Sequence, residues 1–291
     1  MSTRREFLAA SATTMLAPAA MPDRISFAQW SINRSYRAGV WKTLEVPRIM
    51  KDKLGIDALE FVNQFFENPT LNYLRKLKKS CADAGVTPVL IMVDEEDPTA
   101  GTDAAERRAA AAAHHKYIDI AHYLGCHAIR CNMRGGPQTG WQQDTGMLDR
   151  AAESFRDIVA YAKGSGVKVL IENHGGASSD PDVLVALMKK VNDPQFGMLV
   201  DLGNWNKGDD QYAAIAKVLP WARGISVKDI PGWDLPKKLR MCMESGFHGF
   251  WGIESGARPA EGATPQQIFE AECQAALKIK AVLEQVVLKK A

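Results

Sequence analysis

Three acidic residues stand where short apolar segments end. Glu172 closes KVLIE, Asp201 closes FGMLVD and Glu254 closes FWGIE, and each is followed at once by loop residues. A carboxylate at the end of a buried strand is costly unless a partner compensates its charge. Three such carboxylates, arriving from three strands, are most simply explained by one shared partner, and a divalent cation is the simplest one.

The spacing of these residues indicates the fold. Glu172 and Asp201 are 29 residues apart, and Asp201 and Glu254 are 53 residues apart, which is about twice the first spacing. One more strand is therefore expected between the last two, and GISVKD (224–229) supplies it. This rhythm is typical of a (β/α)8 barrel, whose active site lies at the C-terminal ends of its strands.

The rest of the chain follows the same pattern. Helical segments with apolar residues three and four apart fill the gaps between strands, and several of them end at a glycine. This alternation predicts an α/β protein with a single (β/α)8 TIM-barrel domain over residues 21–291, rather than a doubly wound sheet. The expected strands lack strict alternation, as do parallel strands covered on both faces; they are 25–31, 58–63, 87–93, 128–132, 168–173, 196–202, 224–229 and 250–255.

Composition excludes several classes of protein. The 291 residues are 46% hydrophobic and 24% charged, with a net charge of +2, which is ordinary for a globular domain. No run of Lys and Arg suggests nucleic-acid binding, and no segment reaches the roughly 18 apolar residues of a membrane span. The five cysteines show neither metal-ligand nor disulfide spacing, so we expect them to be buried and inert.

The first 20 residues resemble a twin-arginine export signal. Arg4 and Arg5 precede a modest apolar stretch, and Ala17-Pro18-Ala19 offers a cleavage site. The mature protein is then expected to begin near Ala20 and to work in the periplasm or otherwise outside the cytoplasm. The alternative is a basic leader on a cytoplasmic protein.

The residues just after each predicted strand should share one rim of the barrel. That rim is polar and mixed in charge, which suits a polyhydroxylated or anionic small molecule and not an apolar one. We expect substrate hydroxyl groups to be bound by five of these residues: Gln29, Asn63, Arg130, Asn132 and Asn204.

Glu172, Asp201 and Glu254 are oxygen ligands, which favour Mn²⁺ or Mg²⁺ and also accept Co²⁺. A metal ion there would polarise a carbonyl and a neighbouring hydroxyl and acidify the proton between them. Glu172 or Glu254 can alternatively move that proton. The structural alternative is that each carboxylate only forms a salt bridge, with Lys228, Arg130 or Arg134.

His174 lies two residues after Glu172 and, on an alternating strand end, points the same way. It is a candidate for acid–base work or for a hydrogen bond to a sugar hydroxyl, and the alternative is a histidine satisfied by a neighbouring carbonyl. Lys228 is a candidate for stabilising an enediolate or for holding a hydroxyl, and the alternative is a lysine paired with Asp201.

The sequence resembles the xylose-isomerase-like barrels, the sugar phosphate isomerase/epimerase family that also contains endonuclease IV. The resemblance covers nearly all of the chain after the leader and is carried by AQWS, GIDALEFVNQFF, LGCHAIRCN, IENHGGASSDPD, LVDLGNW, GISVKD and GFHGFWGIES. It implies a divalent metal bound by residues of the last four strands and proton transfer beside a sugar carbonyl. By position, Glu172, Asp201 and Glu254 match three of those ligands.

Two positions depart from the family pattern. Ser226 stands where typical members have the histidine of H-x-K-D, and Asn204 stands where many have the histidine of D-x-x-H. A serine hydroxyl is a weak ligand, so Ser226 would bind a metal poorly or through water. Both changes, with the absence of a basic surface, argue against DNA repair.

The resemblance and the residues together predict a metal-dependent isomerase or epimerase acting on a keto-sugar or sugar derivative by α-proton abstraction. A lyase acting on a keto-glycoside is the nearest catalytic alternative, because elimination begins with the same step. A non-catalytic carbohydrate-binding barrel with a degenerate metal site is the other alternative. A homodimer is compatible with the sequence.

Overall fold

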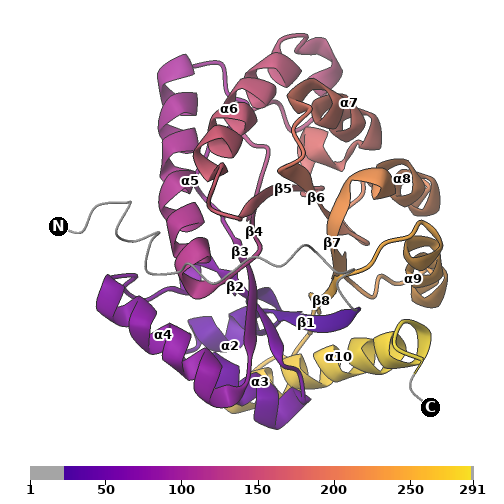
Figure 1. The fold of residues 1–291 in the computed structure, drawn as a ribbon. Helices are drawn as coiled ribbons and strands as arrows, with labels where there is room; N and C mark the ends of the chain where they lie inside the picture. Colours follow the sequence, from indigo (N-terminus) through magenta and orange to yellow (C-terminus); the bar gives the residue numbers. More distant parts are fainter. Residues whose placement is uncertain (1–22, 290–291) are drawn as a thin grey trace. The chain divides into compact units, whose positions relative to one another are not determined.

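The computed structural model describes residues 23–289, so the predicted leader lies outside the described residues. The strands β1 to β8 follow one another in sequence order and close into a barrel (Figure 1). The prediction of a (β/α)8 barrel is confirmed. The chain divides into two compact units, Leu90–Arg223 and the described parts of Pro22–Val89 with Gly224–Ala291.

The first unit holds parallel strands with a helix after each one. Its strands pair in register, with Ile129 opposite Val169 and Ile171 opposite Met198. The helices α5, α6, α7 and α8 pack each against the next. The elements are the end of β3 (Thr87–Met92), α5 (Ala104–Leu124), β4 (Ala128–Cys131), η3 (Trp141–Gln143), α6 (Met147–Ala162), β5 (Lys168–Glu172), η4 (Gly176–Ser179), α7 (Pro181–Val191), β6 (Phe196–Asp201), α8 (Gln211–Val218) and η5 (Leu219–Trp221).

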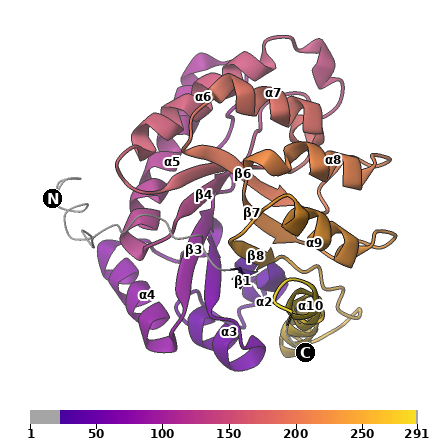
Figure 2. The same ribbon diagram turned by 45° about the vertical axis from the view of Figure 1, so that its right-hand side comes forward.

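The second unit joins the two ends of the described chain. The long C-terminal helix α10 lies beside α2 and α3 (Figures 1 and 2). The elements are β1 (Arg24–Ala28), η1 (Gln29–Ile32), α2 (Asn33–Arg37), α3 (Val46–Leu54), β2 (Ala58–Val62), η2 (Asn63–Phe65), α4 (Leu71–Ala84), most of β7 (Ala222–Val227), α9 (Leu235–Glu244), β8 (Phe250–Ile253) and α10 (Pro265–Val286).

Local sequence explains where the helices begin and end. The side chain of Asp103 accepts hydrogen bonds from two backbone amides at the start of α5, and Asp180 caps α7 ahead of Pro181. Gly125 ends α5 with φ of 90°, a left-handed conformation that suits a residue without a Cβ.

The predicted strands run too long at their carboxyl ends. The segment 25–31 ends as a strand at Ala28, because Gln29 already begins the 3-10 turn η1; similarly, Asn63 begins η2. Strand β7 also begins earlier than predicted, at Ala222. Gln29 and Asn63 are therefore held in 3-10 turns, where the direction of a side chain does not follow the alternation of a strand.

The cysteines are buried free thiols, as predicted. Burial raises the pKa of Cys81 and of Cys242 to about 12, so neither thiol ionises near neutral pH. Within residues 23–289, no helix is both long enough and apolar enough to cross a membrane.

A buried polar pair lies between the strands of the second unit. The Ser26 hydroxyl of β1 donates to Oε1 of Glu60 in β2 over 2.5 Å, and both residues are almost fully buried. Gly252 of β8 pairs with Ser26, and a Cβ built on it would lie 2.4 Å from the same carboxylate oxygen. Glycine at 252 therefore gives the Glu60 carboxylate its room.

We predict that Gly252→Ala lowers the free energy of unfolding by about 1–3 kcal/mol, because the added methyl displaces a buried, hydrogen-bonded carboxylate. Urea unfolding followed by circular dichroism measures the change. Gly256→Ala is the control, since no atom lies within 4 Å of a Cβ at that position. Equal stability of Gly252→Ala and the wild type would show that Glu60 moves aside at little cost.

Candidate active site

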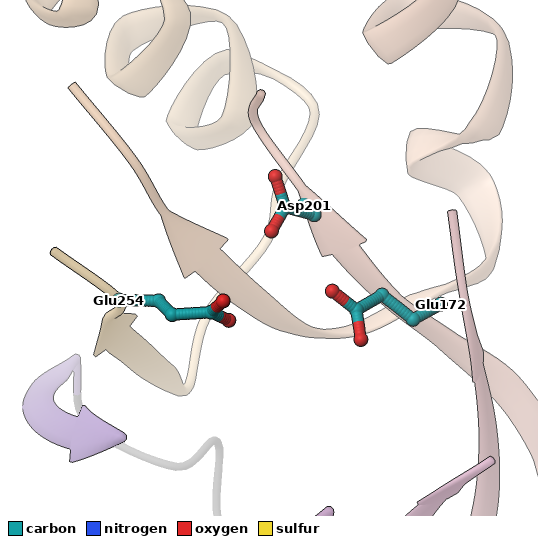
Figure 3. A group of neighbouring side chains, drawn as sticks. All are labelled: Glu172, Asp201 and Glu254. Atoms are coloured by element: carbon teal, nitrogen blue, oxygen red, sulfur yellow. The ribbon is translucent and has the colours of Figure 1, made fainter. Parts of the chain in front are cut away.

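Two of the three predicted metal ligands end neighbouring strands of the first unit. Glu172 is the last residue of β5 and Asp201 the last of β6, and both are buried (Figure 3). Oδ1 of Asp201 accepts hydrogen bonds from the backbone amides of Gly203, at 2.6 Å, and Asn204, at 3.0 Å. The tight turn after β6 thus fixes the orientation of the Asp201 carboxylate and directs its other oxygen, Oδ2, away from these amides.

Arg130 of β4 offsets the charge of two carboxylates. Its Nε lies 2.8 Å from Oε2 of Glu172, and its Nη1 lies 2.6 Å from Oδ1 of Asp94. The side-chain amide of Asn204 also donates a hydrogen bond of 3.2 Å to Oε1 of Glu172. The salt bridge considered as the alternative for Glu172 is therefore present, and Arg130 and Asn204, both predicted to bind substrate, also hold Glu172 in place.

A chain of hydrogen bonds leads from Arg130 to His174. Asp94 accepts from the Asn132 amide over 2.7 Å, and Asn132 Oδ1 lies 2.8 Å from Nδ1 of His174. Since Oδ1 can only accept, Nδ1 carries the proton, and the neutral ring then has its lone pair on Nε2. Arg134 Nη2 lies 3.4 Å from the same Nδ1, a distance too long for a strong hydrogen bond. His174 is thus oriented with Nε2 as a proton acceptor.

The third carboxylate belongs to the second unit. Glu254 directly follows β8, and its Oε1 lies 2.9 Å from Nζ of Lys228. The Ser226 hydroxyl of β7 donates to Oε2 over 3.0 Å. Lys228, predicted to pair with Asp201 if structural, here pairs with Glu254. Ser226, predicted as a weak metal ligand, is hydrogen-bonded to the carboxylate of Glu254.

Gln29 and Asn63 are both buried in the 3-10 turns that follow β1 and β2. Gln29 is fully buried; its Oε1 accepts from the Val62 amide at 2.9 Å, and its Nε2 donates to the Thr43 hydroxyl at 3.4 Å. It therefore ties the end of β1 to the end of β2. Asn63 is also buried, in the 3-10 turn η2. Their roles in substrate binding remain predictions.

Two features of the site were missed in the sequence. Burial raises the pKa of Asp97 to about 6, with Asp94 nearby adding to the effect and Arg134 opposing it, so this loop carboxyl titrates close to neutral pH. The second feature is Arg34, in the first turn of α2. The sequence predicted site residues only up to the end of the first strand, and Arg34 lies beyond it. No short-range sequence pattern identifies Asp97. Arg34 could have been found, because a barrel places the segment after its first strand at the same rim as the other site residues.

Together, the three carboxylates form a set of hard oxygen ligands. One ligand oxygen each of Glu172, Asp201 and Glu254 lies within 4.8 Å of the others (Figure 3). Oxygen-only sets of this kind suit Mg²⁺ and Mn²⁺ better than softer metals. The residues therefore fit the divalent cation that the sequence predicted.

Comparison with known proteins identifies the family. A family model described as xylose isomerase-like TIM barrel matches residues 52–269, and the chain belongs to this family. No curated protein matches the sequence significantly.

Solved structures resemble the whole fold. A xylose isomerase domain protein from Planctomyces limnophilus is 18% identical, with a TM-score of 0.66 over 94% of this chain and 100% of that one. D-psicose 3-epimerase from Clostridium cellulolyticum, solved with D-tagatose, is 18% identical, with a TM-score of 0.66 over 89% and 99%. A xylose isomerase-like protein from Mycobacterium smegmatis, solved with magnesium, is 17% identical, with a TM-score of 0.61 over 91% and 99%. At these identities the likeness concerns the fold.

The Asp94–Arg130 ion pair affects how the free energy of unfolding changes at low pH. Burial alone would raise the pKa of Asp94, but the charge and hydrogen bond of Arg130, with help from Asn132, lower it to about 2. A carboxyl with a depressed pKa in the folded state stabilises the protein above its unfolded pKa, near 4. That contribution is lost as the pH falls from about 4 to about 2.

We therefore predict that Asp94→Asn lowers the free energy of unfolding at pH 7 by about 2 kcal/mol or more, since it also leaves Arg130 with one partner fewer. Its stability should fall less steeply than that of the wild type below pH 4. Urea unfolding at several pH values measures both effects. Asp83→Asn, which breaks an exposed pair with Lys79, should change stability by less than about 1 kcal/mol. Wild-type stability of Asp94→Asn at pH 7 would contradict the prediction.

Proposed function

We propose that the protein is a metal-dependent sugar isomerase or epimerase that removes the proton next to the carbonyl of a keto-sugar or sugar derivative. The observation that carries the proposal is the set of three carboxylate ligand atoms within 4.8 Å of one another at strand ends. Membership of the xylose isomerase-like family and the epimerase and magnesium-bound proteins among the structural neighbours support it.

Glu172, Asp201 and Glu254 would hold the metal ion, with Mn²⁺ or Mg²⁺ preferred and Co²⁺ accepted. When bound, such an ion polarises a carbonyl and the adjacent hydroxyl and so acidifies the proton between them. Ser226 would contribute through its hydrogen bond to Glu254, and directly only as a weak ligand or through water.

The chain itself supplies the groups that move the proton and offset charge. Nε2 of His174 is oriented to accept a proton, because Asn132 fixes the proton on Nδ1. Glu172 or Glu254 can serve as the partner acid or base. Lys228 lies beside Glu254 and can offset the negative charge that develops on the substrate oxygen.

Two other functions are compatible with this site. Loss of a leaving group after the same proton abstraction would make the protein a lyase acting on a keto-glycoside. A non-catalytic carbohydrate-binding barrel is favoured by one observation, namely that Lys228 and Ser226 each engage one oxygen of Glu254. The small-molecule partner is a carbohydrate in each case.

The place of action and the assembly are also proposals. The twin-arginine-type leader supports export to the periplasm, with the cytoplasm as the alternative. A homodimer remains a proposal that sedimentation of the mature protein would test.

Exchange with solvent tests the function directly. The Mn²⁺-loaded protein should incorporate deuterium from D₂O at the carbon next to the carbonyl of a keto-sugar, because abstraction and return of the proton pass through a group that equilibrates with water. NMR spectroscopy of a panel of ketoses and keto-glycosides measures exchange, epimerisation and elimination together. Absence of exchange on every member, with a loaded metal site, would favour the carbohydrate-binding barrel.

We predict that His174→Ala lowers the exchange rate by about 10²- to 10⁴-fold, because the oriented proton acceptor is lost. Its metal content should stay at the wild-type level, since the three carboxylates are retained. His248→Ala is the matched control; His248 is exposed and pairs with Asp23 just before β8, away from the strand ends that carry the site. A wild-type exchange rate for His174→Ala would make His174 a structural residue.

A further inference from the structure

A cavity lies beside Glu254 within the second unit. Its volume is about 450 Å³, and its walls come from the segments that follow β1, β7 and β8. The residues that matter here are Trp30 and Arg34 after β1, Lys228 and Asp229 after β7, and Glu254 and Arg258 after β8. A cavity of this size accommodates a small ligand.

Only some of the charged residues that line this cavity form ion pairs with one another. Lys228 and Glu254 form an ion pair of 2.9 Å and offset each other. Arg34 and Arg258 are both exposed, and neither guanidinium forms an ion pair among residues 23–289. Asp229 is the remaining acidic residue of the lining. Beyond the Lys228–Glu254 pair, the lining therefore carries two arginines and one aspartate, and this balance of charge favours an anion.

The backbone under Arg34 is held rigidly. Glu272 of α10 is buried, and its two carboxylate oxygens accept hydrogen bonds from the backbone amides of Arg34, at 2.9 Å, and Ser35, at 3.2 Å. Both oxygens of the Glu272 carboxylate thus accept hydrogen bonds from the backbone. The Arg34 side chain remains available to a ligand. Because its backbone is already fixed, binding does not have to order it.

The wall that carries Arg258 is tied to the same support. The Ser31 hydroxyl of η1 donates to the carbonyl of Ile253 over 3.0 Å and accepts from the amide of Ser255 over 2.8 Å. These two bonds bracket Glu254 and fix the start of the loop that leads to Arg258. The segments after β1 and β8 are therefore joined by two hydrogen bonds at the base of the cavity wall.

A second hollow extends the positive surface. It has a volume of about 400 Å³ and shares Asp229 and the loop Ser255–Arg258 with the first cavity. Its far wall is α10, which adds the exposed Lys278. Arg258 thus lies between two hollows, and Asp229 is the acidic residue of the second one as well.

We propose that this cavity binds an anionic oxygen group of the substrate, a carboxylate or a phosphate, through Arg34 and Arg258. Guanidinium groups bind both anions with paired hydrogen bonds. In (β/α)8 enzymes generally, the loops after the last two strands are a frequent place for a phosphate group. The inference rests on the proposed function, since Glu254 lines the cavity and is also a ligand of the proposed metal site; it makes the substrate a sugar acid or a sugar phosphate.

Binding to the Mn²⁺-loaded protein tests the inference independently of turnover. Calorimetric titrations would use D-fructose, 2-keto-D-gluconate and D-fructose 6-phosphate as neutral, carboxylate and phosphate probes. At least one anionic probe should bind about tenfold or more tightly than D-fructose at low salt, with the advantage shrinking as salt is added. The tighter of the two anionic probes identifies the anion. Equal binding of all three probes would overturn the inference.

Variants locate the effect. Arg34→Gln and Arg258→Gln should each weaken binding of the preferred anionic probe by about tenfold and leave D-fructose binding unchanged. Arg75→Gln removes the same charge from the exposed face of α4 and should bind like the wild type. Wild-type affinity of both cavity variants for the anionic probe would overturn the assignment. Anion binding that depends on these arginines without any deuterium exchange would instead retain the cavity and contradict the proposed function.

Discussion

Burial of carboxylates at the ends of parallel strands is the constraint on which this structure depends. Glu172 and Asp201 are almost completely removed from water, and neither could stay charged there without compensation. Arg130 provides it for Glu172, the turn amides after β6 provide it for Asp201, and Lys228 provides it for Glu254. Each compensating group also fixes an orientation, so the same interactions that make burial tolerable preorganise the ligand set.

The fold and the three carboxylates could be predicted because their signals are local. Apolar segments that end in an acid at regular intervals reveal both the strands and the rim, and Asp180-Pro181 shows where a helix starts. The partners could not be predicted in this way. The bonds of Ser31 to Ile253 and Ser255, and those of Glu272 to Arg34 and Ser35, join residues more than 220 positions apart, and only the folded chain brings them together.

Ser226 illustrates how a departure from a family pattern acquires a physical meaning. On sequence it replaces a histidine and removes a strong ligand. In the structure its hydroxyl is bonded to Glu254, next to the Lys228 ion pair. Glu254 is thus the residue at which the proposed metal site and the anion cavity meet, since it also lines that cavity. A substrate anion held by Arg34 and Arg258 would lie in the same cavity as Glu254, a ligand of the proposed metal site.

The most direct test of the central claim is the metal content of the purified mature protein, measured by elemental analysis after chelation, reloading with Mn²⁺ and removal of free ions. The account predicts about one tightly held ion per chain, and loss of that ion in Glu254→Gln, in which a neutral amide replaces a charged ligand. A wild-type protein that retains no ion after reloading, or a Glu254→Gln variant that retains it fully, would contradict the account.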